Sequence, residues 1–266
     1  MTKLIAEIGW NHMGDMTLAK DMITAAKESG CDFAKFQTWS VRRLKRGSWD
    51  TDGRREIYEK AELDFNKHLD LKNYCDEIGI GFMSSVFSIE DARLLKNVVT
   101  DYVKIPSFES RNKDLIHYCL KHFKHLLIST GTSTYEEMRN TLQGISRDRF
   151  TLLHCVSSYP CDFDIVNLPR IEILKGLSYS VGFSDHSQGI ESSVLSLGYN
   201  VEFIEKHFTI NNDLPGRDNK FAVLPDDMKK LKKYIDIQKH VGISHGADYQ
   251  KSELDSRKNY VGRFDG

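Results

Sequence analysis

Short apolar runs alternate with longer amphipathic segments along most of the chain. Leu4 to Gly9 has the apolar character of a buried strand, and residues 17–28 then place apolar side chains at helical spacing, ending before Gly30. This pair of patterns recurs eight times. The predicted strands cover residues 4–9, 32–39, 81–86, 102–107, 125–131, 150–157, 178–186 and 201–210. The predicted helices cover residues 17–28, 65–78, 89–98, 113–122, 134–143, 168–175, 189–198 and 225–240.

Strict alternation of strands and helices predicts a parallel sheet with right-handed crossovers, and eight strands are the number that closes a barrel. No Gly-x-Gly-x-x-Gly motif follows the first strand, which disfavours a dinucleotide-binding fold. We therefore predict an α/β fold, a single-domain (β/α)8 TIM barrel over residues 1–246, with residues 247–266 as a linker-like tail. Residues 40–63 form a polar insertion after the second strand, and loops of this length are usually functional or mobile.

Composition narrows the class of protein. The chain has 266 residues and a net charge of −1, which gives no reason to expect nucleic acid as a partner. No signal peptide precedes the first strand, and no apolar run approaches the length of a membrane span, so we expect no membrane partner. Five cysteines without CxxC spacing suit a reduced, cytoplasmic enzyme.

Two histidines close neighbouring strands. His186 follows Ser184-Asp185, and His207 follows Glu205-Lys206 one unit later. In a parallel α/β fold, groups at the carboxyl ends of adjacent strands meet at one site, so the two imidazoles, with Asp185 and Glu205 close by in sequence, are candidates to hold a divalent metal. The alternative is a pair of unrelated, partly buried histidines.

Polar residues stand at or just after the ends of all eight predicted strands. They are Glu7; Lys35 and Gln37; Ser84 and Ser85; Lys104, Ser107 and Glu109; Ser129 and Thr130; His154, Ser157 and Tyr159; Ser184 and His186; and Glu205 and His207. Two lysines among hydroxyls suit a small anion that bears phosphate and carboxylate. A network of buried ion pairs is the alternative for Glu7, Lys35 and Lys104. We disfavour it because hydroxyls rather than carboxylates surround the lysines in sequence.

These residues belong to seven longer motifs, which occur in order along nearly the whole chain. The motifs are IAEIGWNHMGD (5–15), KFQT (35–38), KIPSFE (104–109), HCVSSYP (154–160), FSDH (183–186), EKHFT (205–209) and LPGRDNK (214–220). Together they resemble the sialic acid synthase family, which includes the N-acetylneuraminate, legionaminate and pseudaminate synthases. The resemblance implies a (β/α)8 barrel that condenses phosphoenolpyruvate with an open-chain amino sugar, an aldose, and yields a 2-keto-3-deoxy sugar acid and phosphate.

The resemblance also assigns roles to single residues. It implies catalytic roles for Glu7, Lys35, Lys104, His186 and His207, with the metal on the two histidines. It implies phosphoenolpyruvate binding by Lys35, Ser85, Lys104, Ser107, Ser157 and Ser184. It implies acceptor binding by Gln37, Glu109, Tyr159 and Asp218. Two histidines leave coordination positions open, so we expect Mn²⁺, with Mg²⁺ or Co²⁺ as alternatives, acting as a Lewis acid on the aldehyde oxygen.

The chain departs from the family pattern mainly on the acceptor side. Pro106 and Phe108 stand where the family usually has glycines, Ser85-Val86 replaces Thr-Pro, and Arg217 and Asn219 replace Pro and His. Family members usually continue into a small antifreeze-like domain, and we expect that domain to be absent or to be a separate chain. A homodimer is a further possible partner arrangement. These departures predict an acceptor other than N-acetylmannosamine, or several acceptors.

Three other functions stay open on sequence grounds. A lysine Schiff-base aldolase would use Lys35, Lys104 or Lys206, although it has no need of the histidine pair. A degenerate barrel would bind a sugar acid or phosphate without catalysis, and should have lost a ligand residue. A synthase for a different 3-deoxy sugar acid is the third alternative.

Overall fold

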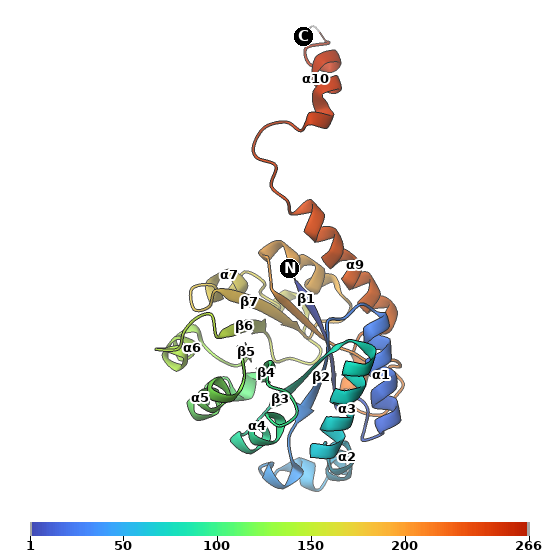
Figure 1. Cartoon of the computed structure of the whole chain (residues 1–266), viewed down its shortest axis with the longest axis vertical. Coiled ribbons are helices and arrows are strands. Elements are labelled where there is room, and N and C mark those ends of the chain that lie inside the picture. The colour runs from blue at the N-terminus through green and yellow to red at the C-terminus, as the bar shows by residue number, and fades with distance from the viewer. Residues whose placement is uncertain (1, 265–266) are drawn as a thin grey trace.

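Eight parallel strands close into a barrel in chain order, in a computed structural model that describes residues 2–264 (Figure 1). The strands are β1 (Lys3–Gly9), β2 (Phe33–Thr38), β3 (Gly81–Val86), β4 (Tyr102–Ile105), β5 (His125–Ser129), β6 (Phe150–Cys155), β7 (Ser180–Asp185) and β8 (Phe203–His207). Pairing of β1 with β8 completes the barrel. The predicted TIM barrel is therefore confirmed, and every predicted strand is present.

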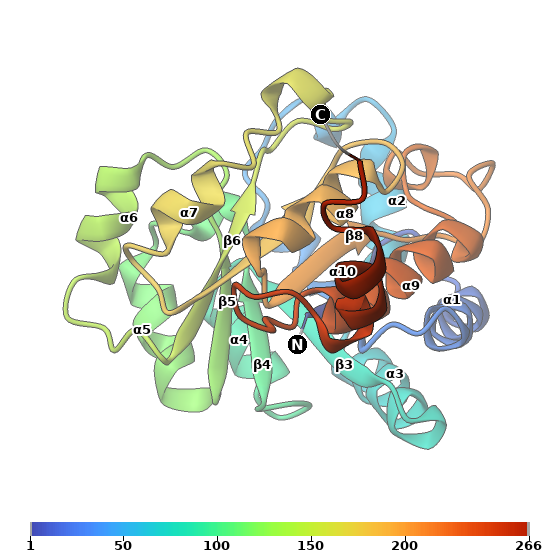
Figure 2. The same ribbon diagram turned by 90° about the horizontal axis from the view of Figure 1, so that it is seen from above.

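A ring of helices surrounds the strands. The helices are α1 (Met16–Glu28), α2 (Arg54–Ala61), α3 (Phe65–Ile78), α4 (Ile89–Leu95), α5 (Lys113–His122), α6 (Tyr135–Leu142), α7 (Arg170–Leu174), α8 (Glu191–Ser196), α9 (Pro225–Val241) and α10 (Leu254–Tyr260). In the view at right angles, α5, α6 and α7 lie along one side of the barrel (Figure 2). Local signals set the ends of the helices: the Asp15 side chain caps α1, and Gly79 ends α3 with φ of 73°.

The polar insertion at residues 40–63 contains a helix that the sequence pattern did not predict. Helix α2 has good helix formers but buries only Ala61 completely, so it lacks the apolar stripe by which the other helices are recognised. The insertion also contains two short 3-10 helices, Val41–Arg43 and Ser48–Asp50. It lies beside the carboxyl end of β2, where it can cover a site.

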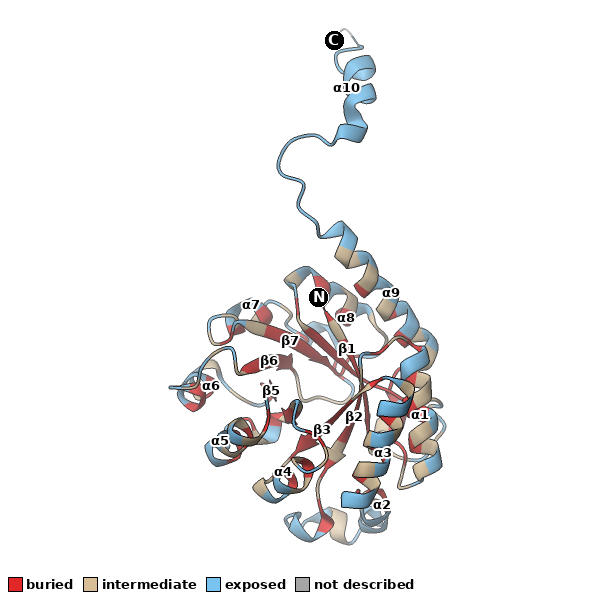
Figure 3. Cartoon of the chain, in the orientation of Figure 1, coloured by how far each residue is buried: buried red, intermediate tan, exposed pale blue. Residues whose placement is uncertain are grey.

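Side chains inside the barrel change from apolar to polar along the strands. Ile5, Met83, Leu127, Leu153 and Phe203 form a buried apolar cluster of their own. A larger apolar cluster fills the space between the strands and the helices, so the strands are buried on both faces (Figure 3). One step nearer the carboxyl ends, the inward positions become ionisable or hydroxyl-bearing. The apolar cluster thus forms the floor of a polar cavity.

Residues 242–264 leave the barrel after α9, and α10 lies away from it (Figure 1). Their side chains are exposed, including Tyr249, Leu254 and Tyr260. The division of the chain at residue 246 stays a prediction. None of the helices described here has the length and apolar character that crossing a bilayer requires.

Candidate active site

A cavity of about 440 Å³ opens at the carboxyl ends of the strands. Twelve of the thirteen predicted site residues line it. They are Glu7, Lys35, Gln37, Ser85, Lys104, Ser107, Ser157, Tyr159, Ser184, His186, His207 and Asp218. The predicted meeting of the strand ends is therefore correct, whereas the chemical roles of these residues stay predictions. We call this space the catalytic cavity.

Strand register explains why the charged residues meet. Glu7 is the neighbour of Lys35 on one side and of His207 on the other, and Ser85 is the neighbour of Lys104. Side chains at paired positions of adjacent parallel strands point to the same face. The sequence shows which side chains of one strand share a face. The register shows which residues of the neighbouring strand lie beside them.

Buried carboxylates pair with both lysines. Lys35 forms an ion pair with Glu7, lies 3.4 Å from Oε2 of Glu205, and donates to Oγ of Ser85 at 2.9 Å. Lys104 forms an ion pair with Glu205, whose Oε1 also accepts from Oγ of Ser184 at 2.9 Å. The network of buried ion pairs that we disfavoured on sequence grounds is therefore present, and the hydroxyls of Ser85 and Ser184 contact the lysines as well. Glu7 and Glu205 are distant from the lysines in sequence and reach them only through barrel closure.

The pKa values of the two carboxyl groups are shifted in opposite directions. Burial raises the pKa of Glu7, and Lys35 only partly offsets this effect. Burial also disfavours ionised Glu205, but Lys104 and Lys35 together outweigh it and lower the pKa of Glu205. Burial opposes the charge on Lys35 as well, yet Glu205 and Glu7 raise its pKa. Protonation of Glu7 would leave two ammonium groups facing one carboxylate, a balance that favours a bound anion.

His186 and His207 face each other, with ring centroids 5.5 Å apart. Nδ1 of His186 is 2.8 Å from the carbonyl oxygen of Val156, so Nδ1–H donates there and Nε2 keeps its lone pair. Burial and the neighbouring His186 lower the pKa of His207 well below its ordinary value, which keeps its imidazole neutral. Nδ1 of His207 is buried without a hydrogen-bond partner among the described residues. Burial opposes a charge on His186, but Cys155 outweighs this effect and raises its pKa, so metal binding there would displace a proton. The neutral His207, and His186 in its deprotonated form, have lone pairs that fit a metal.

The described residues do not supply a full set of protein ligands for a metal ion. Among them, no group of three or more His, Cys, Asp and Glu side chains is placed to share one ion. The carboxylate of Asp218 is close to the pair, with Oδ2 3.9 Å from Nδ1 of His207. The residues therefore suit a metal that keeps positions open for substrate or water, as catalytic sites do.

Asp185 does not join the histidines. Its carboxylate lies on the outer face of β7, where it accepts from the hydroxyls of Ser187 and Ser193 and pairs with Lys206 at 3.1 Å. The suggestion that Asp185 contributes to a metal site is therefore wrong. Strand alternation explains this placement, since Ser184 points inward and Asp185 must then point outward.

Four more polar residues at the strand ends are absent from the lining of the cavity: Ser84, Ser129, Thr130 and His154. Two of them illustrate the reason. Ser84 bonds to Oγ1 of Thr38, and His154 bonds through Nε2 to the carbonyl oxygen of Val166. Both are neighbours in sequence of inward-facing residues. Sequence alternation therefore contained the information that these side chains face the helices.

Cys155 is a cavity neighbour that the sequence patterns did not select. Its Sγ is 3.7 Å from Nδ1 of His186 and 3.5 Å from Oγ of Ser107.

Gly131 packs against the hydroxyl of Ser107, and a Cβ at residue 131 would be 2.7 Å from Oγ of Ser107. Because glycine has no side chain, residue 131 leaves room for the hydroxyl groups of Ser107 and Ser157. Oγ of Ser157 is buried and has no hydrogen-bond partner among the described residues, so it is free to donate to a ligand.

The residues that depart from the family pattern separate into two groups. Arg217 and the exposed Phe108 line the catalytic cavity, and Nη2 of Arg217 lies 3.5 Å from the carbonyl oxygen of Tyr159. Asn219 is buried and bridges loops instead, accepting from Thr209 and donating to the carbonyl oxygen of Asn11. Arg217 is thus placed to contact a ligand, and Asn219 holds the loop.

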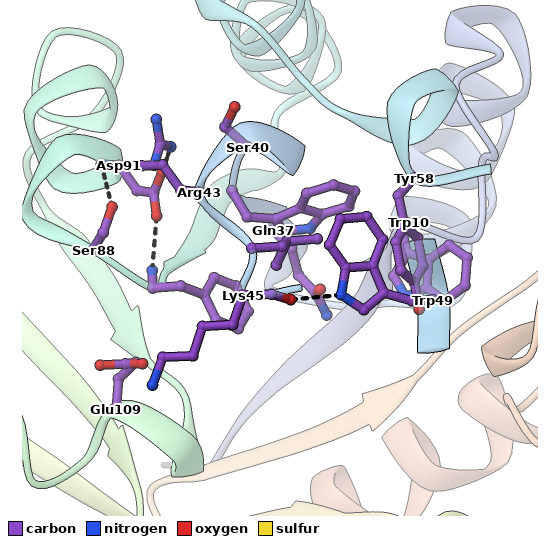
Figure 4. Close-up of a pocket in the computed structure, with 13 residues that line it drawn as sticks. Trp10, Gln37, Ser40, Arg43, Lys45, Trp49, Tyr58, Ser88, Asp91 and Glu109 are labelled. Carbon is purple, nitrogen blue, oxygen red and sulfur yellow. Dashed lines mark hydrogen bonds and ion pairs between the residues drawn. The ribbon is translucent and has the colours of Figure 1, made fainter. Parts of the chain in front are cut away.

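Glu109 is the predicted acceptor residue that does not line the catalytic cavity. It lines a second cavity of about 600 Å³, formed largely by the 40–63 insertion (Figure 4). Trp10, Trp39, Trp49 and Tyr58 also line this second cavity, and sequence analysis selected none of them. The aromatic content of the insertion was the signal available in the sequence.

Comparison with protein-family models matches residues 22–245 to the NeuB family. An N,N'-diacetyllegionaminic acid synthase from Campylobacter jejuni is 34% identical over 259 residues, covering 91% of this chain and 78% of the relative. A pseudaminic acid synthase from Helicobacter pylori is 30% identical over 261 residues, covering 92% of this chain and 76% of the relative.

Solved structures show the same similarity. The crystal structure of an N-acetylneuraminic acid (sialic acid) synthetase from Leptospira borgpetersenii, in complex with citrate, superposes with a TM-score of 0.87 at 28% identity. The match covers 98% of this chain and 92% of that one. The similarity therefore extends over both the barrel and its cavity.

Proposed function

Because the chain belongs to the NeuB family, we propose that it condenses phosphoenolpyruvate with an open-chain amino sugar to give a sialic acid-like 2-keto-3-deoxy sugar acid and phosphate. It is a carbon–carbon bond-forming transferase. The observation that carries the proposal is one cavity in which two lysines, four serine hydroxyls and a pair of histidines meet. The serines are Ser85, Ser107, Ser157 and Ser184.

Binding of phosphoenolpyruvate falls to the lysines and the hydroxyls. Lys35 and Lys104 carry the positive charge, and they exchange part of their contact with Glu7 and Glu205 for the phosphate and carboxylate of the ligand. Burial raises the pKa of Glu7, which makes its protonation easier, and protonation would reduce the repulsion that this anion meets. The lysines then stabilise the charge of phosphate as it leaves, in a site already organised for it.

The acceptor binds on the histidine side. Gln37 donates to Oε1 of Glu7 at 2.8 Å, which places its amide beside the reacting centre, and Tyr159 and Asp218 face the sugar hydroxyls. His186 and His207 would hold Mn²⁺, or Mg²⁺ or Co²⁺, which when bound supplies Lewis-acid activation of the aldehyde oxygen. The Glu7 carboxyl lies in the same cavity and is placed to transfer a proton near the new bond.

The reaction balances without a further reactant besides water. The enol carbon of phosphoenolpyruvate forms a bond to the aldehyde carbon, and the aldehyde oxygen becomes a hydroxyl. Water then adds at C2 of the former enol, and the C–O bond to phosphate breaks, which leaves the keto group. The cavity residues hold both substrates in one place, which replaces a bimolecular encounter.

Two of the three candidate lysines do not suit a Schiff-base mechanism. Glu205 and Glu7 raise the pKa of Lys35, so its amine stays protonated and is not nucleophilic. Lys206, whose pKa burial lowers, points outward to Asp185 and lies outside the catalytic cavity. Neither lysine combines a free amine with access to substrate.

The test is phosphate release from phosphoenolpyruvate with a panel of candidate aldoses, with the mass of each product measured. Release of phosphate together with a product equal to aldose plus pyruvate supports the proposal. Binding of phosphoenolpyruvate without turnover on any aldose, with Mn²⁺ present, would instead support a non-catalytic barrel. Size-exclusion chromatography with light scattering tests whether the chain is a homodimer.

A further inference from the structure

The second cavity adjoins the catalytic cavity. Trp10, Gln37 and Phe87 line both spaces, so the two lie side by side with only these side chains at their border. The predicted acceptor residues are divided between the two: Asp218 lines the first, Glu109 lines the second, and Gln37 lines both. An acceptor that contacts all three residues must therefore extend from one cavity into the other.

Aromatic rings form the wall of the second cavity, which we call the aromatic cavity. Tyr58 lies at the centre, with its ring 5.5 Å from Trp10 and 5.9 Å from both Trp39 and Trp49. Nε1 of Trp49 donates to the carbonyl oxygen of Lys45 at 2.7 Å, a bond drawn in Figure 4. Contacts of this kind hold the rings in place before a ligand arrives.

Charge around the aromatic cavity is balanced. Arg43 forms an ion pair with the buried Asp91, and the remaining charged residues, Lys45 and Glu109, have opposite signs. No excess positive charge is available for a phosphate group. Aromatic walls with balanced charge suit an uncharged group that presents an apolar face.

The chemistry of the reaction fixes which end of the acceptor reaches this cavity. The aldehyde at C1 must remain free and must lie beside His186 and His207, so C1 carries no substituent. The carbons remote from C1 point past Gln37. The aromatic cavity is larger than the catalytic one, at about 600 against 440 Å³, and an acetyl group is small for such a space.

We propose, on the basis of the proposed function, that the aromatic cavity binds an uncharged acyl substituent larger than acetyl. This substituent is carried as an amide or ester on C4, C5 or C6 of the acceptor. The insertion at 40–63 then determines acceptor specificity, while the barrel interior performs the condensation. The Campylobacter jejuni relative is named for a diacetylated product, and the proposed group is bulkier than those acetyl groups.

The first experiment compares acceptors with the wild-type protein, phosphoenolpyruvate and Mn²⁺. The series consists of N-acetylmannosamine and its derivatives that carry acetyl, butanoyl or benzoyl groups on C4, C5 or C6. At one or more of these positions, kcat/KM for the benzoyl acceptor should exceed that for the acetyl acceptor by about ten- to a hundredfold, the range expected from burying an apolar group of this size. A 6-phosphate and a 6-glucosyl acceptor complete the series.

The second experiment changes the cavity. Trp49→Ala and Tyr58→Ala should reduce the ratio of kcat/KM for the preferred acyl acceptor to that for the acetyl acceptor to near one. Tyr179→Ala is the matched control, because Tyr179 is an exposed aromatic residue outside both cavities, and this variant should keep the wild-type ratio. A ratio within one variant does not depend on the fraction of folded protein.

The outcomes separate the two proposals. Absence of phosphate release with every acceptor contradicts the proposed function itself. Turnover of simple aldoses, combined with a lower kcat/KM for larger acyl groups at all three positions, overturns the acyl proposal alone. Preference for the phosphate or the glucosyl acceptor over every acyl acceptor also overturns it, as does a Trp49→Ala variant with the wild-type ratio.

Discussion

Replacement of Lys104 by methionine tests the charge network most directly. Lys104→Met keeps the length of the side chain and removes the ammonium group that pairs with Glu205. Loss of one charge-assisted hydrogen bond costs about 1.5–3 kcal/mol, which raises the Kd for phosphoenolpyruvate about ten- to a hundredfold. Because Lys104 already has Glu205 as a partner in the free protein, part of its interaction with the ligand is offset, and we expect the lower half of that range.

The folded state should survive this change. Breaking a buried ion pair typically costs about 3–5 kcal/mol when it leaves a charge without a partner. Glu205 keeps Ser184 at 2.9 Å and Lys35 at 3.4 Å, so its charge remains compensated. The destabilisation of Lys104→Met should therefore fall below that range, as measured by urea unfolding.

Lys206→Met is the matched control. Lys206 is also a buried lysine paired with a carboxylate, and Asp185 would likewise retain hydroxyl partners, but this pair faces the helices. Calorimetric titration with phosphoenolpyruvate at fixed ionic strength should show a higher Kd for Lys104→Met and the wild-type Kd for Lys206→Met. An unchanged Kd in Lys104→Met, or an equal loss in both variants, would refute the assignment.

Four further predictions follow from the cavity. His186→Ala should abolish both Mn²⁺ binding and turnover with an unchanged circular dichroism spectrum, and full activity in excess chelator would contradict this role. Burial raises the pKa of Glu7 above its ordinary 4.5, so the folded state holds this proton more tightly than the unfolded state does. The contribution of the protonated carboxyl to the free energy of unfolding is therefore fully present below pH 4.5 and is lost as the pH rises through the folded-state pKa. Glu7→Gln should therefore gain in urea stability relative to wild type with rising pH, and a pH-independent difference would argue against the raised pKa. Arg217→Ala should lower kcat/KM for acceptors that carry a carboxylate or phosphate about tenfold more than for neutral acceptors, and equal losses would place Arg217 outside the acceptor site. Gly131→Ala should raise the Kd for phosphoenolpyruvate by displacing Ser107 while Mn²⁺ affinity stays the same, and an unchanged Kd would show that the serine is not a ligand.

The barrel and most of its cavity were predictable because strand periodicity carries both kinds of information. Alternation in β8 places Glu205 and His207 inside and Lys206 outside, and the structure has this arrangement. Repetition of strand and helix gave the number of strands and hence closure. The strand count and the position of each residue in its own strand were therefore enough to predict which side chains meet at the carboxyl ends of the strands.

Partners across the barrel were not predictable in the same way. Glu205 lies 101 positions from Lys104 in sequence, and their pairing follows from closure and register rather than from a local pattern. The aromatic cavity was missed for a different reason. Helix α2 lacks an apolar stripe, and Tyr58, which contacts Trp49 within the insertion, meets Trp10 just after β1 only in the folded chain.

Glu205, Lys206 and His207 are consecutive residues with partners on alternating faces of one strand. A one-residue insertion or deletion within β8 would turn Lys206 into the catalytic cavity and both neighbours toward the helices, so all three groups would lose their partners at once. We therefore expect relatives to share the length of β8. The 40–63 loop has no such constraint, since lengthening a surface loop costs little and moves no strand. On the acceptor role proposed above, changes in this loop would alter the sugars that the enzyme accepts and leave the bond-forming residues in place.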